Sequence, residues 1–280
     1  LCATLASFYQ HIPVGHVEAG LRTGDIHSPF PEEANRRLVS PLASLHFAPT
    51  DASREALLRE RIPDEAISVT GNTVVDALFM ELRRQEQEQV GDALRARLAD
   101  LIGEDWLQRT SILVTGHRRE NLGGGFEQIC AALAALSQRF PDSLIVYPVH
   151  LNPNVLKVVH GQLADTENIR LIEPQPYAEF MMLAKSCRII LTDSGGVQEE
   201  APSLGKPVLV MRDTTERPEG VEAGTVKLVG PKADRIVEEA TKLLTDSAAY
   251  QAMANVANPY GDGHAAERIV QRVAKYLYPR

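Results

Sequence analysis

The stretch Arg188-Ile-Ile-Leu-Thr-Asp-Ser-Gly-Gly-Val-Gln-Glu-Glu-Ala-Pro-Ser-Leu-Gly-Lys-Pro-Val-Leu209 decides the fold of this chain. Its apolar residues 189–191 predict a buried parallel strand, residues 197–204 a helix with acids near its start, and residues 208–211 the next strand. The two glycines of the turn let a ligand approach the backbone, and unpaired amides at a helix start attract phosphate. The turn therefore indicates a nucleotide-diphosphate site, although two glycines also occur in purely structural turns.

A second polar loop follows the next predicted strand and reads Asp213-Thr-Thr-Glu-Arg-Pro-Glu219. Ligands of parallel sheets bind outside the carboxyl ends of the strands, so we expect both loops to border one crevice. Arg217 is placed there to neutralise a phosphate or to hold a carboxylate. Glu199 and Glu200, in the first turns of the predicted helix, are placed to accept hydrogen bonds from ribose hydroxyls.

Short apolar runs alternate with helical patterns after residue 72. The runs are 112–115, 144–148, 169–172, 189–192, 208–211 and 226–229. Between them, residues 126–136 and 236–244 each carry apolar side chains on one helical face. This alternation predicts a doubly wound α/β domain with a parallel sheet. A long, increasingly polar helical stretch at 74–100 is expected before it.

The first 72 residues predict a smaller α/β segment. Its expected elements are a helix to residue 11, a strand at 12–18, a long loop at 19–31, a helix at 32–42, a strand at 45–48, a helix at 52–59 and a strand at 67–70. Thr50 is a typical N-cap for the helix at 52–59. Residues 265–278 predict a final amphipathic helix.

Composition excludes several classes of function. The 280 residues carry a net charge of −8 with no basic block, so we expect no nucleic-acid partner. No apolar run reaches transmembrane length, and the eight histidines show no ligand-like spacing, so we expect no membrane span and no metal. Of three scattered cysteines, Cys130 and Cys187 lie in apolar contexts typical of buried thiols in a reducing compartment, which predicts a cytoplasmic protein.

Further stretches carry a family resemblance. They are His16-Val-Glu-Ala-Gly-Leu-Arg-Thr-Gly24, Pro31-Glu-Glu-Ala-Asn-Arg36, Thr70-Gly-Asn-Thr73, Thr115-Gly-His-Arg-Arg-Glu-Asn121 and Tyr147-Pro-Val-His-Leu-Asn-Pro-Asn154. Together with the first stretch, they resemble the non-hydrolysing UDP-N-acetylglucosamine 2-epimerases of bacteria. The resemblance covers essentially the whole chain, and the combined motifs are highly specific.

The resemblance implies two Rossmann-like domains of the glycosyltransferase-B type with an interdomain cleft. Residues 1–72 would belong to the N-terminal domain, with the helix 265–280 packing back on it, and residues 73–264 would form the UDP-binding domain. Family members carry a further N-terminal segment, roughly half a domain of this type. Its Gly-Thr-Arg-Pro-Glu and His-Gly-Asp motifs do not occur here. We therefore expect the first domain to lack its N-terminal half, and this chain by itself to be inactive or poorly folded.

The resemblance also implies roles for individual residues. Glu18, Glu32 and His117 match the active-site acids and histidine, and His150 matches a residue of a second, regulatory site that binds the substrate. The residues that match the uridine-nucleotide site are Gln175, Phe180, Ser194, Gly195, Gly196, Glu200 and Arg217. Phe180 would lie by the base and Glu200 would take the ribose hydroxyls.

Without the resemblance, each of the three catalytic candidates also has a simpler structural interpretation. Glu18 also suits an acid paired with Arg22. Glu32 opens a predicted helix, where the dipole favours any acid. His117 is flanked by Arg118 and Arg119, and a surface histidine beside arginines is common.

The implied reaction is reversible C2 epimerisation of UDP-N-acetylglucosamine to UDP-N-acetylmannosamine, feeding cell-surface polysaccharide synthesis. It would proceed by anti elimination of UDP to 2-acetamidoglucal and re-addition. The C2 hydrogen has no adjacent carbonyl, and no GxGxxG motif for a redox dinucleotide occurs in the chain, so elimination is the remaining route. Glu18 and Glu32 would serve as acid and base, with the assignment open. The resemblance further implies a homodimer, no cofactor, and UDP-N-acetylglucosamine as both substrate and effector.

The sequence leaves three alternatives to the non-hydrolysing epimerase. A glycosyltransferase of the same architecture would share the UDP site but need an acceptor, and a hydrolysing epimerase would release free UDP and N-acetylmannosamine. A non-catalytic fragment is the third. Incubation with UDP-N-acetylglucosamine alone separates them, because only the non-hydrolysing epimerase gives the mannosamine nucleotide.

Overall fold

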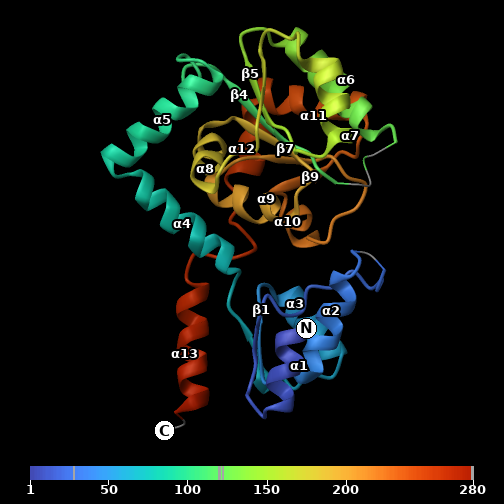
Figure 1. The fold of residues 1–280 in the computed structure, drawn as a ribbon, viewed down its shortest axis with the longest axis vertical. Coiled ribbons are helices and arrows are strands. Elements are labelled where there is room, and N and C mark those ends of the chain that lie inside the picture. Colours follow the sequence, from blue (N-terminus) through green and yellow to red (C-terminus); the bar gives the residue numbers. More distant parts are fainter. Residues whose placement is uncertain (28, 119–120, 122, 279–280) are drawn as a thin grey trace. The chain divides into compact units, whose positions relative to one another are not determined.

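A computed structural model describes residues 1–27, 29–118, 121 and 123–278. The chain divides into two compact units, which are treated separately (Figure 1). Unit 1 comprises Leu1–Phe79 and Pro259–Arg280, and unit 2 comprises Met80–Asn258. The division falls within helix α4 (Thr73–Gln85), which contributes to both units.

Unit 2 is built on a parallel sheet whose strand order in the described residues is β6-β5-β4-β7-β8-β9. The strands are β4 (Ser111–Thr115), β5 (Leu144–Pro148), β6 (Ile169–Ile172), β7 (Ile189–Thr192), β8 (Val208–Val210) and β9 (Val226–Leu228). Every apolar run predicted to be a strand is confirmed. The order places β4 and β7 side by side although a long stretch of chain separates them, which is the doubly wound arrangement that the alternating pattern predicts.

Helices flank this sheet (Figure 1). They are α5 (Glu88–Ile102), α6 (Gly125–Arg139), α7 (Pro153–Leu163), α8 (Tyr177–Ser186), α9 (Gly195–Glu200), α10 (Pro218–Ala223), α11 (Ala233–Thr245) and α12 (Ser247–Ala254). Because side chains alternate across a strand, Ile112 and Val114 pack into one core with residues of α6, α7 and α11. Leu113 points to the opposite face and packs with residues of α5 and α8. Both faces of the sheet are therefore covered, and the strands are rigid supports for the loops that follow them.

Unit 1 contains a smaller parallel sheet. Its strands are β1 (Gly15–Val17), β2 (Leu45–Ala48) and β3 (Ile67–Val69), paired in that order, and its helices are α1 (Cys2–Tyr9), α2 (Glu32–Val39), α3 (Asp51–Arg59) and α13 (Ala265–Leu277). Thr50 is the N-cap of α3, as predicted, since its side chain accepts a hydrogen bond from the Ser53 amide at 3.1 Å. Helix α13 is fixed at its start by Asp76, which accepts from the amides of Ala265 and Ala266 at 3.1 and 2.8 Å.

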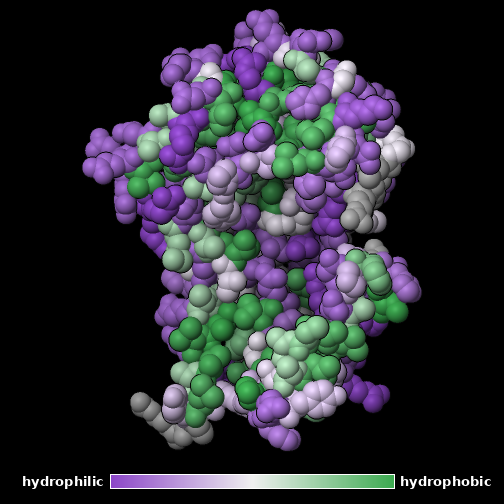
Figure 2. All heavy atoms as spheres, in the orientation of Figure 1, coloured by the Kyte–Doolittle hydropathy of each residue, from purple (hydrophilic) through white to green (hydrophobic). Residues whose placement is uncertain are grey.

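The core of unit 1 is small, because its cluster of buried apolar residues consists of Ala19, Ala48, Leu57 and Ile67. Apolar side chains gather on the face of unit 1 in view in Figure 2. Helices α1 and α13 contribute exposed apolar residues such as Phe8 and Val270. None of the helices among the described residues combines the length and the apolar character needed to cross a membrane.

Three predicted helices were wrong in extent. The helix at 32–42 changes to a 3₁₀ turn at Ser40–Leu42, and the helix at 197–204 is α9 followed by a 3₁₀ turn at Ala201–Leu204. Each turn contains a proline, which has no N–H to continue the α-helical ladder. The stretch at 74–100 is two helices, α4 and α5, and the Gln85 side chain at the break donates to the Ala178 carbonyl at 2.9 Å.

Candidate functional site

The carboxyl ends of β4 and β7 form the point where the strand order of unit 2 reverses. From β4 the chain proceeds outward through β5 to β6, whereas from β7 it proceeds the other way through β8 to β9. The two loops therefore leave neighbouring strands and diverge, opening the sheet edge at that point. Open parallel sheets bind their ligands there. His117 follows β4, and Asp193 to Gly196 follow β7.

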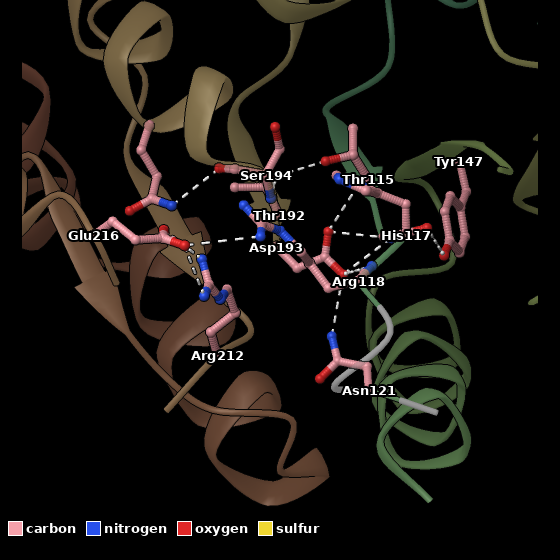
Figure 3. Close-up of polar contacts among 12 residues, drawn as sticks. Thr115, His117, Arg118, Asn121, Tyr147, Thr192, Asp193, Ser194, Arg212 and Glu216 are labelled. Atoms are coloured by element: carbon pink, nitrogen blue, oxygen red, sulfur yellow. Dashed lines mark hydrogen bonds and ion pairs between the residues drawn. The ribbon is translucent and has the colours of Figure 1, made fainter. Parts of the chain in front are cut away.

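Asp193 connects these two loops. Its side chain is 0% exposed, and its carboxylate accepts hydrogen bonds from the His117 amide at 3.0 and 3.1 Å and the Arg118 amide at 2.9 Å. The Asn121 side chain donates at 3.1 Å, and His117 Nδ1 lies 3.1 Å from Oδ1 (Figure 3). Burial on its own raises the pKa of Asp193, but the hydrogen bonds from His117 and Arg118 outweigh it and lower the pKa. Asp193 is thus a charged, fully partnered carboxylate, which our sequence prediction did not include among the site residues.

The ring of His117 is held on two sides. Its edge faces Asp193, and its face stacks on His150 with ring centroids 5.9 Å apart and an interplanar angle of 27°. The side chain remains 39% exposed and so is open to a ligand. His150 is fixed in turn, because its Nδ1 accepts from the Asn152 amide at 3.1 Å. Arg119, predicted to flank His117, lies outside the described residues.

The turn after β7 presents backbone rather than side chains. The Ser194 amide donates to Thr192 Oγ1 at 2.9 Å, which fixes the start of the turn. Gly195 is buried, and a Cβ atom built there would lie 2.9 Å from the Arg217 guanidinium carbon. Gly196 is exposed, and a Cβ there would meet nothing within 4 Å. The backbone at Gly196 is accordingly the open part of the turn.

Arginines and glutamates surround this turn in an ion-pair network. Arg217 Nε donates to Glu199 Oε1 at 2.7 Å, and Glu216 accepts from Arg212 at 2.9 Å. Arg118 reaches Glu216 at 3.8 Å, which links the loop after β4 to the loop after β8 (Figure 3). Burial alone raises the pKa of Glu216, yet the hydrogen bond and charge of Arg212 hold it at about 2. Arg217 thus pairs with a carboxylate of the protein itself, and its predicted contact with a ligand stays a prediction.

Glu200 lies at the C-terminal end of α9 and not in its first turn, because α9 begins at Gly195. Glu200 as a whole is 8% exposed, and its carboxylate accepts from the Tyr177 hydroxyl at 2.7 Å. Burial raises the pKa of Glu200, and the Tyr177 hydrogen bond opposes that rise only in part. Phe180 is half-buried on α8, the helix that also carries Tyr177. Gln175, just before α8, donates to the Glu173 carbonyl at 2.8 Å.

Unit 1 holds the two carboxylates predicted to be catalytic, and both are exposed. Glu18 follows β1 with a φ of 59°, in the left-handed region that non-glycine residues rarely adopt. Arg22, its alternative partner from the sequence, instead pairs with Glu60 at 2.8 Å. Glu32 is the first residue of α2. A strained backbone at an exposed acid is typical of a functional position.

Glu33, next to Glu32, has a structural role. It is 0% exposed and accepts from the amides of Thr23 and Gly24 at 3.2 and 3.3 Å. It thereby anchors the long loop that follows Glu18. The two neighbouring glutamates differ in exposure, which leaves Glu32 as the acid available for chemistry.

The predicted residues of unit 2 lie beyond the carboxyl ends of β4, β5, β6, β7 and β8, with Gln175 and Phe180 in the segment after β6, while Glu18 and Glu32 belong to unit 1. The sequence prediction missed Asp193, Glu216 and Arg212. An acid directly after a buried strand is a signal that would have found Asp193. Within the part of the chain that the structure describes, His, Cys, Asp and Glu residues form no group of three or more suited to a metal ion.

Comparison with known proteins gives a consistent answer. The family model described as UDP-N-acetylglucosamine 2-epimerase matches residues 1–274. The UDP-N-acetylglucosamine 2-epimerase of Escherichia coli K12 is 58% identical over 274 residues, covering 97% of this chain and 71% of that protein.

Solved structures agree in fold over nearly the same span. The Neisseria meningitidis UDP-GlcNAc 2-epimerase bound to UDP-GlcNAc has a TM-score of 0.91 at 50% identity, covering 98% of this chain and 72% of that one. The S. aureus MnaA–UDP structure has a TM-score of 0.89 at 46% identity, covering 98% and 72%. The α/β architecture with parallel sheets predicted from the sequence is therefore confirmed.

Proposed function

This chain belongs to the UDP-N-acetylglucosamine 2-epimerase family, and we propose that it interconverts UDP-N-acetylglucosamine and UDP-N-acetylmannosamine by reversible inversion at C2. The relatives that match it carry that name, and one of the matching structures holds UDP-N-acetylglucosamine. The proposed reaction uses only the side chains and backbone of the protein.

The main structural support for this proposal is the reversal of strand order between β4 and β7. At this point His117 and the open backbone of Gly196 leave neighbouring strands of one rigid sheet. A glycine whose missing side chain faces open space suits a ligand that must approach the main chain closely, as a diphosphate does. Arg217 supplies positive charge next to the same turn.

The uridine nucleotide is proposed to bind along unit 2. The diphosphate contacts the backbone of Ser194, Gly195 and Gly196, with Arg217 neutralising charge. The ribose hydroxyls bind Glu200, whose carboxylate already accepts one hydrogen bond from Tyr177. Phe180 lies by the base, and Gln175 contacts the uridine as well.

The reaction begins with removal of the C2 proton by a carboxylate. The C2–H electrons form the C1–C2 double bond of 2-acetamidoglucal, and the C1–O bond breaks with its electron pair leaving on UDP. Re-addition of the same UDP oxygen to C1, with protonation of C2 from the opposite face, gives the epimer. The departing charge must be stabilised while UDP is retained, which fixed donors in a preformed site achieve.

We assign the proton transfers to Glu18 and Glu32 and the stabilisation of departing UDP to His117. Two acids are needed because the proton leaves one face of the sugar and arrives on the other. Both carboxylates are exposed, and the neighbouring Glu33 is occupied by backbone amides. His117 is exposed beside the Ser194 turn.

Regulation, assembly and location are further parts of the proposal. His150 stacks on His117, so a substrate molecule bound at His150 would touch a residue used in the reaction. The family resemblance supports a homodimer and a product that feeds cell-surface polysaccharide synthesis. Cys130 and Cys187 are buried free thiols, which burial holds at a pKa of about 12, and this suits the cytoplasm.

The test is proton NMR of UDP-N-acetylglucosamine incubated with the complete protein in deuterated water. We expect UDP-N-acetylmannosamine to appear and both epimers to carry deuterium at C2. Free UDP with free sugar would indicate hydrolysis instead. Turnover that needs an added sugar acceptor would indicate a transferase, and either result contradicts the proposal.

A further inference from the structure

His117 is attached to Asp193 through both its main chain and its ring. The carboxylate accepts from the His117 amide and lies 3.1 Å from ring Nδ1. A carboxylate only accepts hydrogen bonds, so Nδ1 must carry a proton in this contact. In neutral His117 the second nitrogen, Nε2, is then unprotonated.

Other contacts prevent the carboxylate from turning. The Arg118 amide and the Asn121 side chain both bind Oδ2, at 2.9 and 3.1 Å, and the group is shielded completely from solvent. The strands on either side are locked together as well, since the hydroxyls of Thr115 and Thr192 lie 2.5 Å apart. Asp193 is therefore a fixed acceptor at a fixed distance from the imidazole.

We propose that Asp193 is a positioning residue that fixes both the orientation and the tautomer of His117, so that Nε2 is the nitrogen offered to the substrate. The catalytic significance of this contact rests on the function proposed above, whereas the tautomer itself does not. The structure supplies both parts of the constraint: the edge contact with Asp193 and the face contact with His150.

The constraint has a chemical consequence. A ring held by its Nδ1–H gains and loses a proton only at Nε2. When Nε2 is protonated, it donates a hydrogen bond to the oxygen that leaves C1, and the positive charge of the ring is balanced by the buried Asp193 carboxylate. When UDP returns to C1, the oxygen loses its negative charge and the hydrogen bond from Nε2–H weakens, so the proton stays on Nε2 throughout. Without Asp193, the ring is free to present either nitrogen.

The first measurement is the nitrogen-15 NMR spectrum of His117 in the full chain without ligand. At a pH where the ring is neutral, we expect the proton on Nδ1 and none on Nε2, the reverse of the form that free histidine prefers. Asp193→Asn should release this preference. Asn121→Ala removes a different hydrogen bond to the same carboxylate and should keep the proton on Nδ1. A proton on Nε2 in the unmodified protein would overturn the proposal.

The second measurement separates positioning from a general structural effect. We expect Asp193→Asn to lower kcat about 100-fold, within the range typical of lost acid–base or charge stabilisation, with the Kd for UDP changed less than about threefold. In a His117→Ala background the same substitution should lower kcat less than about twofold further, because residues that act as a unit are not additive. If Asp193→Asn lowered kcat by the same factor with and without His117, the proposal would be contradicted.

The two measurements also distinguish this inference from the proposed function. If His117 carries its proton on Nδ1 but the protein binds no UDP, the proposed function fails and the tautomer assignment stands. If epimerisation proceeds with His117 protonated on Nε2, the positioning role fails and the function stands.

Discussion

The Arg217 guanidinium lies directly over the backbone of Gly195, 2.9 Å from where a Cβ atom of a larger residue would be. We therefore expect Gly195→Ala to push the guanidinium away from the turn and from Glu199. The Kd for UDP should rise at least about tenfold, which corresponds to loss of one charge-assisted hydrogen bond. Isothermal titration calorimetry measures this, and unchanged affinity would show that Arg217 does not take part.

Gly196→Ala is the matched variant, because its Cβ would face open space in the free protein. We expect the free energy of unfolding to stay within about 1 kcal/mol of the parent, since alanine suits a helix better than glycine. The Kd for UDP should nevertheless rise at least about tenfold, because a methyl group would occupy the space needed for close approach of the diphosphate. Equal UDP affinity in parent and variant would place the diphosphate elsewhere.

Ribose recognition is tested at Glu200, the buried acceptor of the Tyr177 hydroxyl. Glu200→Gln should weaken UDP binding about tenfold, the effect of losing hydrogen bonds to a charged group. A 2′,3′-dideoxy analogue of UDP is the control, because it lacks the hydroxyls that the carboxylate would bind. The analogue should bind parent and variant equally, and a loss for both ligands would refute a ribose role.

The left-handed backbone at Glu18 predicts opposite effects on stability and activity. Glu18→Gly should raise the free energy of unfolding by up to about 1 kcal/mol by relieving strain, and it should abolish epimerisation because the carboxylate is gone. Arg61→Gly is the control, since Arg61 has a similar φ of 64° outside the candidate site. It should give the same stabilisation, measured by urea unfolding with circular dichroism, and leave turnover unchanged. Full activity in the Glu18 variant would exclude it from the chemistry.

The ionised Glu216 carboxylate should make the free energy of unfolding of unit 2 depend on pH. Its pKa is about 2 in the folded protein against an ordinary value of 4.5, so its charged form favours folding. That contribution is fully present above about pH 4.5 and is lost as the pH falls toward 2. Glu216→Gln should reduce the free energy of unfolding by about 3 kcal/mol at pH 7, because it removes the ion pair between Glu216 and buried Arg212. Fluorescence of buried Trp106 in unit 2 reports the transition.

The difference in stability between the parent and the Glu216→Gln variant should shrink steadily as the pH falls from about 4.5 to about 3. A difference that stays constant over this range would mean that the Arg212 contact does not perturb the titration of the Glu216 carboxylate.

The elements that the sequence predicted best are those with a local signal. The runs at 144–148 and 189–192 match β5 and β7 residue for residue, because a buried parallel strand is apolar on both faces. The run at 169–172 matches β6 as well, although Arg170 interrupts its apolar residues. The errors in helix extent also have local causes at Pro41 and Pro202, which were present in the sequence. The break between α4 and α5 has no glycine or proline to mark it, so tertiary contacts decide it.

For the candidate site, too, the sequence identified individual residues but not their contacts. Motif resemblance identified His117, Arg217 and Glu200 as candidates, but it contained no information about which groups touch. The contact between Asp193 and His117 joins residues 76 positions apart, and their proximity depends on the strand order of the finished sheet. The bond between Tyr177 and Glu200 likewise depends on how α8 packs beside α9. Partners of this kind follow from topology and not from local sequence.

The most direct test of the account is a crystal structure of the protein with bound UDP. We expect the diphosphate to accept hydrogen bonds from the backbone amides between Ser194 and Gly196, next to Arg217, with His117 Nε2 facing a phosphate oxygen. A diphosphate bound away from that turn, with the Gly196 backbone left open to solvent, would contradict it.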